Sequence, residues 1–307
     1  MRVLGASMSL TNVREPQAAL WGFYSFKRSE LLKELEQSFK NPTLGPGALP
    51  ERRQQLVQVI GGVAPHAGYS YSGPCAACLY KEIGENKPQV DTVVLIGTNH
   101  SGFGGTITTT TYFSTWLTPL GRVEVDLELI KLLKKEYGAL DDDALAHVRE
   151  HSVEVQIPFL QFIYGDTFKI VPIVVKALDF VQAGEFANSL KNAATSLGRD
   201  VIVIASSDFT HHGSMYDYIV FTSNISSNVK KLDMEFINAV LELDTKRFLS
   251  LIRKYGATVC GFGAIAIAME YAKLVKGKTK LLRYYNSAEV TGEEDIAVGY
   301  ASILFYK

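Results

Sequence analysis

Thr92-Val-Val-Leu-Ile-Gly-Thr-Asn-His100 is an apolar run that ends in a polar turn and a histidine. Two further stretches follow this pattern, Gln58-Val-Ile-Gly-Gly-Val-Ala-Pro-His66 and Val201-Ile-Val-Ile-Ala-Ser-Ser-Asp-Phe-Thr-His211. Continuous apolar runs are typical of strands that are covered on both faces of a sheet. In open α/β sheets, ligands and catalytic groups gather beyond the carboxyl ends of such strands. His66, His100 and His211 are therefore the first candidates for a metal or acid–base site.

Strand-like and helix-like segments alternate along most of the chain. The predicted strands cover 56–64, 91–97, 104–112, 168–175, 200–206, 281–287 and 296–306. The predicted helices cover 29–39, 74–85, 125–137, 150–163, 179–197, 224–242, 245–255 and 260–276. This alternation indicates an α/β fold with a mainly parallel or mixed central sheet flanked by helices. The polar, β-branched segment 106–113 favours an edge strand or a smaller secondary sheet.

The composition predicts one globular domain over residues 1–307. No linker-like break follows residue 52, and the Pro- and Gly-rich stretch 40–54 is expected to be a surface loop. Lys and Arg number 31 against 32 Asp and Glu, and no basic stripe occurs, which argues against nucleic acid as a partner. Three cysteines form no disulfide framework, and no apolar run approaches a membrane span. We therefore expect a cytoplasmic protein without a membrane partner.

Cys260 opens the apolar segment predicted as the helix 260–276. A helix N-terminus favours the thiolate, which is the form of cysteine that binds metals. A buried cysteine that acts as a small hydrophobic residue is the alternative. Asp208 lies three residues before His211 and is placed to orient that ring for proton transfer. Cys75 and Cys78 form a single C-x-x-C motif, which is interpreted as structural because no second C-x-x-C accompanies it.

Two further histidines lie near the predicted helix 150–163. Glu150, His151 and Glu154 fall on or near one face of that helix, so they either face a pocket or solvate the helix start. His147 has no such context and is expected at the surface. Tyr69 lies in a stretch of small residues and tyrosines after His66, which is typical of a shaped pocket.

Taken together, these motifs resemble the Memo family (mediator of ErbB2-driven cell motility). The matching stretches are Ala64-Pro-His66-Ala-Gly-Tyr69, Gly97-Thr-Asn-His100, Glu150-His-Ser-Val-Glu154, Ser206-Ser-Asp-Phe-Thr-His211 and Thr258-Val-Cys260-Gly261. The resemblance runs from about Arg14 to the C-terminus and leaves residues 1–13 as an N-terminal extension. The family fold is similar to that of the class III extradiol dioxygenases, whose iron is held by two histidines and a carboxylate.

The resemblance implies a role for several residues. His66 and His100 look like the imidazole ligands of a metal ion, and Cys260 stands where the dioxygenases have a carboxylate. His211, with Asp208, corresponds to an acid–base or pocket position. The implied cofactor is one iron or copper ion, with zinc as an alternative, because a thiolate makes the site softer. The implied pocket residues are Tyr69, Asn99, Glu154 and His151.

The resemblance implies three possible functions. The first is a metal-binding, redox-type protein that uses His66, His100 and Cys260. The second is an active non-haem iron dioxygenase, so that an enzyme would be a metal-dependent oxidoreductase. The third is a non-catalytic binding module whose cleft receives a peptide or a small ligand, since animal members have been associated with phosphotyrosine-peptide recognition. The oligomeric state is left open.

Overall fold

Four parallel strands form the centre of the sheet. In this computed structural model, which describes residues 12–54, 56–293 and 295–307, they lie in the order β8 (Lys169–Val175), β3 (Thr92–Thr98), β9 (Val201–Ser206) and β2 (Val59–Ala64). Every side chain from Val93 to Ile96 is buried, which explains why these runs are continuously apolar. Ala64 pairs with Ser206 at the ends of β2 and β9, so the loops that follow the two strands leave the sheet at the same level.

Further strands extend the sheet on both sides, so that it is mixed. Next to β2 lies the antiparallel β12 (Ala297–Tyr306), which also pairs antiparallel with β11 (Lys278–Asn286) and β10 (His211–His212). On the other side of the centre, β6 (Gly121–Val125) pairs parallel with β8. Next come β5 (Thr115–Thr118), which is antiparallel to β6, and β1 (Val13–Arg14), which is parallel to β5. The short β4 (Ile107–Thr109) pairs with β8 and with β7 (Asp141–Asp142).

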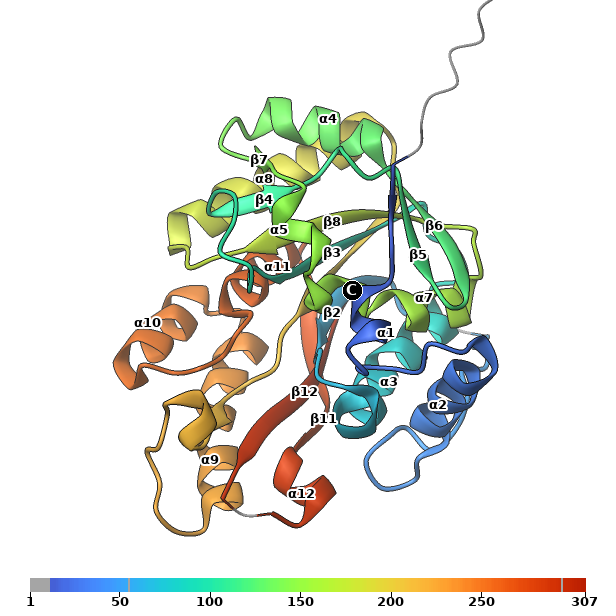
Figure 1. The fold of residues 1–307 in the computed structure, drawn as a ribbon. Helices are drawn as coiled ribbons and strands as arrows, with labels where there is room; N and C mark the ends of the chain where they lie inside the picture. Colours follow the sequence, from blue (N-terminus) through green and yellow to red (C-terminus); the bar gives the residue numbers. More distant parts are fainter. Residues whose placement is uncertain (1–11, 55, 294) are drawn as a thin grey trace, which may run out of the picture.

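Helices cover both faces of the sheet (Figure 1). On one side pack α2 (Arg28–Lys40), α3 (Tyr69–Asn86) and α7 (Ile157–Tyr164). On the other side pack α4 (Leu127–Glu136), α8 (Phe180–Ser196), α9 (Ile225–Leu241), α10 (Thr245–Tyr255) and α11 (Phe262–Leu274). The short helices are α1 (Gln17–Leu20), α5 (Leu145–Val148), α6 (His151–Glu154), α12 (Ser287–Thr291) and a 3₁₀ turn at Ser214–Tyr216. The α/β architecture predicted from the sequence is confirmed.

Some predicted elements differ from the structure. The helix expected over 150–163 is two helices, α6 and α7, because Pro158 lacks an N–H and sits in the first turn of a new helix. The helix expected from residue 74 begins at Tyr69, with Pro74 inside it. The β5–β6 hairpin and α12 were not predicted. The segment 106–113 was expected to form an edge strand or a smaller sheet. It contributes only β4, which pairs with β8 and lies beside the main path of the same sheet.

The expected surface loop at 40–54 lies between α2 and β2, and its described residues beyond Lys40 form no helix or strand. Most of the expected N-terminal extension, residues 1–11, lies outside the described residues. None of the helices described is both long and apolar enough to cross a membrane.

Candidate metal centre

The loops after β2, β3 and β9 meet the loop before α11 at one edge of the sheet. His66 Nε2 lies 3.2 Å from the Sγ atom of Cys260. One ligand atom each from His66, Asp208 and Cys260 lies within 4.8 Å of the others. The sequence placed these residues at strand ends and at a helix start, and the fold brings them into one cluster. Metal ligands spaced in this way can share one ion.

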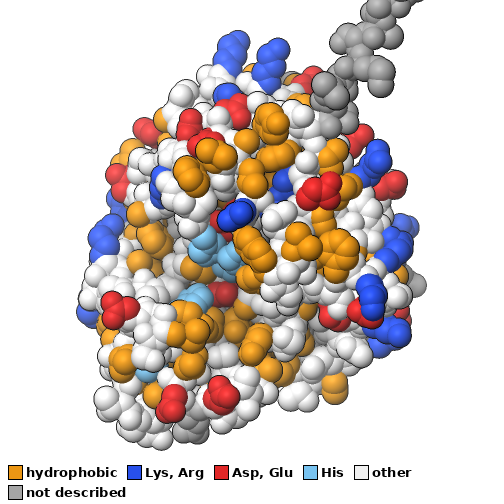
Figure 2. Space-filling model, in the orientation of Figure 1, with side chains coloured by type: hydrophobic (Ala, Val, Ile, Leu, Met, Phe, Trp, Pro, Cys, Tyr) orange, Lys and Arg blue, Asp and Glu red, His pale blue; other side chains and the backbone are white. Residues whose placement is uncertain are grey.

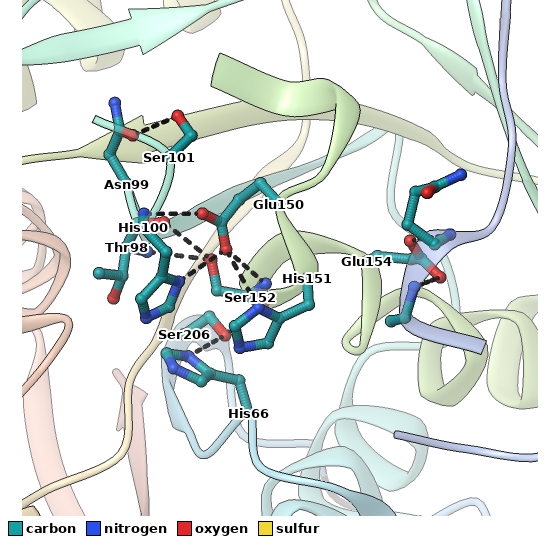
Figure 3. A network of polar contacts seen from close by, with 12 residues as sticks. His66, Thr98, Asn99, His100, Ser101, Glu150, His151, Ser152, Glu154 and Ser206 are labelled. Atoms are coloured by element: carbon teal, nitrogen blue, oxygen red, sulfur yellow. Dashed lines mark hydrogen bonds and ion pairs between the residues drawn. The ribbon is translucent and has the colours of Figure 1, made fainter. Parts of the chain in front are cut away.

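His151 joins the same cluster from the start of α6. Its ligand atom lies within 4.8 Å of those of His66 and His100, which form a second group that shares His66 with the first. The rings of His100 and His151 stack with their centroids 4.6 Å apart, while His66 meets both edge-on (Figure 3). His151 therefore faces the site, and the solvated-face alternative for this residue is wrong.

The hydrogen bonds of His66 determine which ring nitrogen is free. Ser206 Oγ lies 3.2 Å from Nδ1 of His66, donates its own proton to the carbonyl of Ser152 and accepts from Gln156 Nε2. Because that hydroxyl proton is already committed, Nδ1 of His66 must be the donor to Ser206. In the neutral ring the lone pair then lies on Nε2, the atom that faces Cys260, which is the tautomer a metal ligand needs.

Glu150 orients His100 in a similar way. Its carboxylate accepts from Nδ1 of His100 at 2.9 Å and from the backbone N–H of His100 at 2.8 Å (Figure 3). It also caps α6 by accepting the N–H of Ser152. Burial opposes its charge, but the hydrogen bond and charge of His100 lower the pKa of Glu150 to about 2. Glu150 was not among the predicted site residues, although an acid directly before a histidine at a helix start was a usable signal.

Replacing Glu150 with Gln should weaken metal binding about 10–100-fold, as is typical when a partner that orients a metal-binding histidine is lost. The near-isosteric amide keeps the packing but removes the charge that holds Nδ1 of His100. Competition against a chelator measures the affinity. Glu128→Gln, which alters an exposed carboxylate on α4, is the matched control. Equal affinities for the two variants and the wild type would contradict the assigned role.

Cys260 is held close to β9 by the absence of a side chain at Gly261. A Cβ atom at Gly261 would lie 2.6 Å from the Ser206 carbonyl oxygen and 2.6 Å from Ser207 Cβ, so only glycine fits there. The N–H of Gly261 donates to Ser207 Oγ at 2.9 Å. This close approach brings the thiol to the strand end just before α11 begins. The close backbone contact that the flanking glycines suggested is confirmed at Gly261.

The cluster holds an unusual charge distribution. Burial opposes ionisation of the Cys260 thiol, but the imidazoles of His66 and His100 hold its pKa well below the usual range. Burial also opposes the charging of His66, yet Cys260 and Asp208 raise its pKa to about 9. For His151, burial and the neighbouring His66 lower the pKa to about 3. A thiolate held among imidazoles is a donor set suited to a cation.

His211 lies at the rim of the cluster, after β9. Its Nδ1 is 3.0 Å from the carbonyl oxygen of Phe209 and 3.1 Å from that of Thr258. Carbonyl oxygens only accept hydrogen bonds, so Nδ1 carries the proton and Nε2 is the basic atom. Nε2 lies 3.9 Å from Oδ2 of Asp208. Asp208 itself is buried and accepts the backbone N–H of His66 at 2.8 Å.

Two cavities open onto this cluster from different sides. One, of about 320 Å³, is lined by Asp208, His211, Tyr71, Tyr216 and neighbouring residues. The other, of about 530 Å³, has His100 and His151 among its lining residues. Figure 2 shows histidine side chains gathered in a hollow near the centre of this face, with apolar side chains around it. The candidate centre is therefore accessible from outside, although His66 and Asp208 are buried.

Three of the predicted pocket residues stabilise the fold and do not face the cluster. Glu154 is fully buried and faces away from the histidines, bound by Arg14 and by the N–H groups of Gln17 and Ala18 (Figure 3). Tyr69 packs in the hydrophobic core and donates its hydroxyl to the carbonyl of Val155. Asn99 shapes the turn after β3, where its side chain bonds to residues 101–103. Of the four predicted pocket residues, His151 alone faces the cluster.

His147 was expected at the surface, and this expectation is wrong. The side chain is completely buried, with its ring 6.2 Å from that of Trp116. Burial and the nearby charge of Arg14 lower the pKa of His147 to about 4. The ring is therefore neutral in the folded protein near neutral pH.

This burial predicts an acid sensitivity that a single substitution should reduce. In the unfolded chain a histidine titrates near 6.5, so unfolding takes up a proton at His147 once the pH falls below that value. The free energy of unfolding should therefore fall by about 2 kcal/mol between pH 7 and pH 5 because of this residue alone. His147→Phe should remove that share of the decrease in urea titrations at the two pH values. An identical decrease in the variant and the wild type would show that His147 is not held neutral.

The fold and the cluster define the class of this protein. It is an α/β protein with a partly buried cluster of histidines, a cysteine and a carboxylate at the carboxyl ends of parallel strands. Residues 14–304 match the family of Memo-like proteins. A MEMO1 family protein of Methanopyrus kandleri is 38% identical over 284 residues, which cover 92% of this chain and 95% of the relative. A MEMO1 family protein of Pyrobaculum aerophilum is 40% identical over 297 residues, 96% of this chain and 99% of the relative.

A MEMO1 family protein of Thermococcus kodakarensis is similar over the same extent, with 38% identity over 300 residues, 95% of this chain and 99% of the relative. The chain belongs to the Memo family, and the resemblance drawn from its five motifs is confirmed.

Proposed function

We propose that this protein binds one iron or copper ion through His66, His100 and Cys260 and acts as a redox-type metalloprotein. The observation that carries the proposal is the 3.2 Å separation of His66 Nε2 and Cys260 Sγ within a cluster of further donor atoms. An imidazole nitrogen and a thiolate sulfur on one tetrahedral ion would lie about 3.6 Å apart, given bonds of roughly 2.1 and 2.3 Å. Little rearrangement is needed to place an ion between them.

The donor set fits such an ion in chemistry as well as in spacing. His66 and His100 both commit Nδ1 to a hydrogen-bond acceptor, Ser206 or Glu150, which leaves Nε2 for a metal. The neighbouring imidazoles hold the pKa of the Cys260 thiol well below its usual range, which favours the thiolate. Imidazole with thiolate suits copper and iron, and zinc is the redox-inactive alternative. When bound, iron or copper would supply one-electron chemistry.

The chain's own groups prepare the surroundings for that chemistry. Ser206 and Glu150 fix the rings of His66 and His100, and burial of His66 keeps bulk water from one side of the site. Nε2 of His211 is a basic atom at the rim, directed toward Asp208 and the smaller cavity. It can take up or release a proton on a ligand in that cavity.

The position of His211 also supports a second candidate, a non-haem iron dioxygenase. A dioxygenase needs a proton-transferring group beside the metal-bound substrate, and His211 lies in such a place. The thiolate of Cys260 in place of a carboxylate argues for the redox protein over the dioxygenase. Oxygen consumption by the iron-loaded protein with a panel of catechols separates the two: uptake that depends on His211 supports the dioxygenase.

Metal analysis of the purified protein tests the proposal. The wild type, expressed without added metals, should contain close to one iron or copper ion per chain. His66→Ala should lose that ion, whereas His212→Ala, a histidine that is not part of the cluster, should retain it. Unchanged metal content in His66→Ala, with the fold verified by circular dichroism, would refute the proposed centre.

A further inference from the structure

The larger cavity beside the cluster has several apolar side chains in its walls. It measures about 530 Å³, within the range of small-molecule sites. His100 and His151 are among its lining residues, and its other walls come from the end of α1, the loop after β3 and helix α5. The apolar wall residues are Trp21, Phe103, Leu145 and Val148.

These wall residues are unusually exposed for their type. Trp21 is 49% exposed, Phe103 52% and Leu145 56%. Single exposed apolar residues are common, but apolar side chains that gather around one cavity mark a binding surface. Trp21 and Phe103 also offer flat rings against which an apolar group can pack.

Among the described residues that line the cavity, Arg149 is the one arginine or lysine, and none is an Asp or Glu. Arg149 is exposed, and the nearest acid along the chain, Glu150, directs its carboxylate to His100 and His151. The smaller cavity differs, because Asp208 and Glu293 line it. An anion would therefore be attracted to the larger cavity and repelled from the smaller one.

We propose that the cavity formed by Trp21, Phe103, Leu145, Val148 and Arg149 binds a small amphipathic carboxylate. Its apolar body would lie against Trp21 and Phe103, and its carboxylate would pair with the guanidinium of Arg149, which can form two parallel hydrogen bonds with it. This inference rests on and deepens the proposed function, since His100, which lines the cavity, is one of the proposed metal ligands.

Binding can be followed through the protein's own fluorescence. Of the two tryptophans, Trp21 lines the cavity and Trp116 is completely buried. The probes are 3-phenylpropanoate, the uncharged 3-phenylpropan-1-ol with a similar body, and acetate as the head group alone. We expect 3-phenylpropanoate to change the emission of the full-length protein and to bind at least about tenfold more tightly than the alcohol or acetate. Trp21→Phe should abolish the emission change.

Arg149→Gln provides the decisive comparison. In this variant the advantage of the carboxylate over the alcohol should disappear, while Arg253→Gln, an exposed arginine on α10, should bind both probes like the wild type. Equal binding of carboxylate and alcohol by the wild type, or an unchanged preference in Arg149→Gln, would overturn the proposal. So would the absence of binding for all three probes at millimolar concentration.

The metal content of each variant separates this inference from the proposed function. Arg149 is not a proposed ligand, so Arg149→Gln should keep the ion. Loss of probe binding with normal metal content supports the cavity proposal. Normal metal content with no carboxylate preference in the wild type would refute the cavity proposal and leave the metal centre standing.

Discussion

Replacing Arg14 with Met should destabilise the protein by about 3–5 kcal/mol, the cost typical of removing one partner from a buried ion pair. Arg14 and Glu154 are both almost completely buried and paired with each other. The Met side chain fills much of the same volume but leaves the carboxylate of Glu154 without its counter-ion. Urea denaturation followed by circular dichroism measures the change.

The same substitution should also weaken metal binding, because Arg14 donates to the backbone carbonyls of His147 and Glu150. These contacts hold the segment that carries Glu150 and His151. Arg247→Met breaks an exposed pair with Glu242 and should cost about 1 kcal/mol or less, with metal affinity unchanged. A small loss of stability in Arg14→Met, similar to that of Arg247→Met, would contradict the role given to the buried pair.

Replacing Cys260 with Ser should weaken the affinity for copper(I) by at least about 100-fold and that for iron(II) by less. Copper(I) is a soft ion that prefers thiolate, whereas iron(II) also accepts harder oxygen and nitrogen ligands. The hydroxyl is smaller than the thiol and stays neutral, so His66 also loses the negative charge it faces at 3.2 Å. Titrations against chelators of known affinity measure both ions.

Cys78→Ser is the matched control for this prediction, because Cys78 lies on α3 and bonds to the carbonyl of Pro74. Its metal affinity should equal that of the wild type. If Cys260→Ser retained its affinity for copper(I), the thiolate could not be a ligand, and the alternative group of His66, His100 and His151 would become the preferred site.

The sequence predicted those parts of the site that depend on local pattern. The apolar runs of β2, β3 and β9 identified strands that are buried on both faces, and the residues after them had to meet at one edge. For that reason His66, His100 and His211 could be grouped without a structure. Cys260 could be added because a glycine and an apolar helix follow it.

Contacts between residues far apart in the chain were beyond such reasoning. Glu154 was predicted to line the pocket, but it pairs with Arg14, 140 residues away, and no local pattern encodes that partner. His147 was expected at the surface for the same reason, since its burial follows from packing near Arg14 and Trp116. Glu150 was weighed only as part of a helix face, because its hydrogen bonds to His100 cross between two loops.

X-ray absorption spectroscopy of the iron- or copper-loaded protein tests the central claim most directly. The proposed centre predicts one sulfur ligand at about 2.3 Å together with imidazole nitrogens at about 2.0–2.1 Å. The sulfur contribution should vanish in Cys260→Ser and persist in Cys78→Ser. A first coordination shell made only of nitrogen and oxygen in the wild type would contradict a centre built on His66, His100 and Cys260.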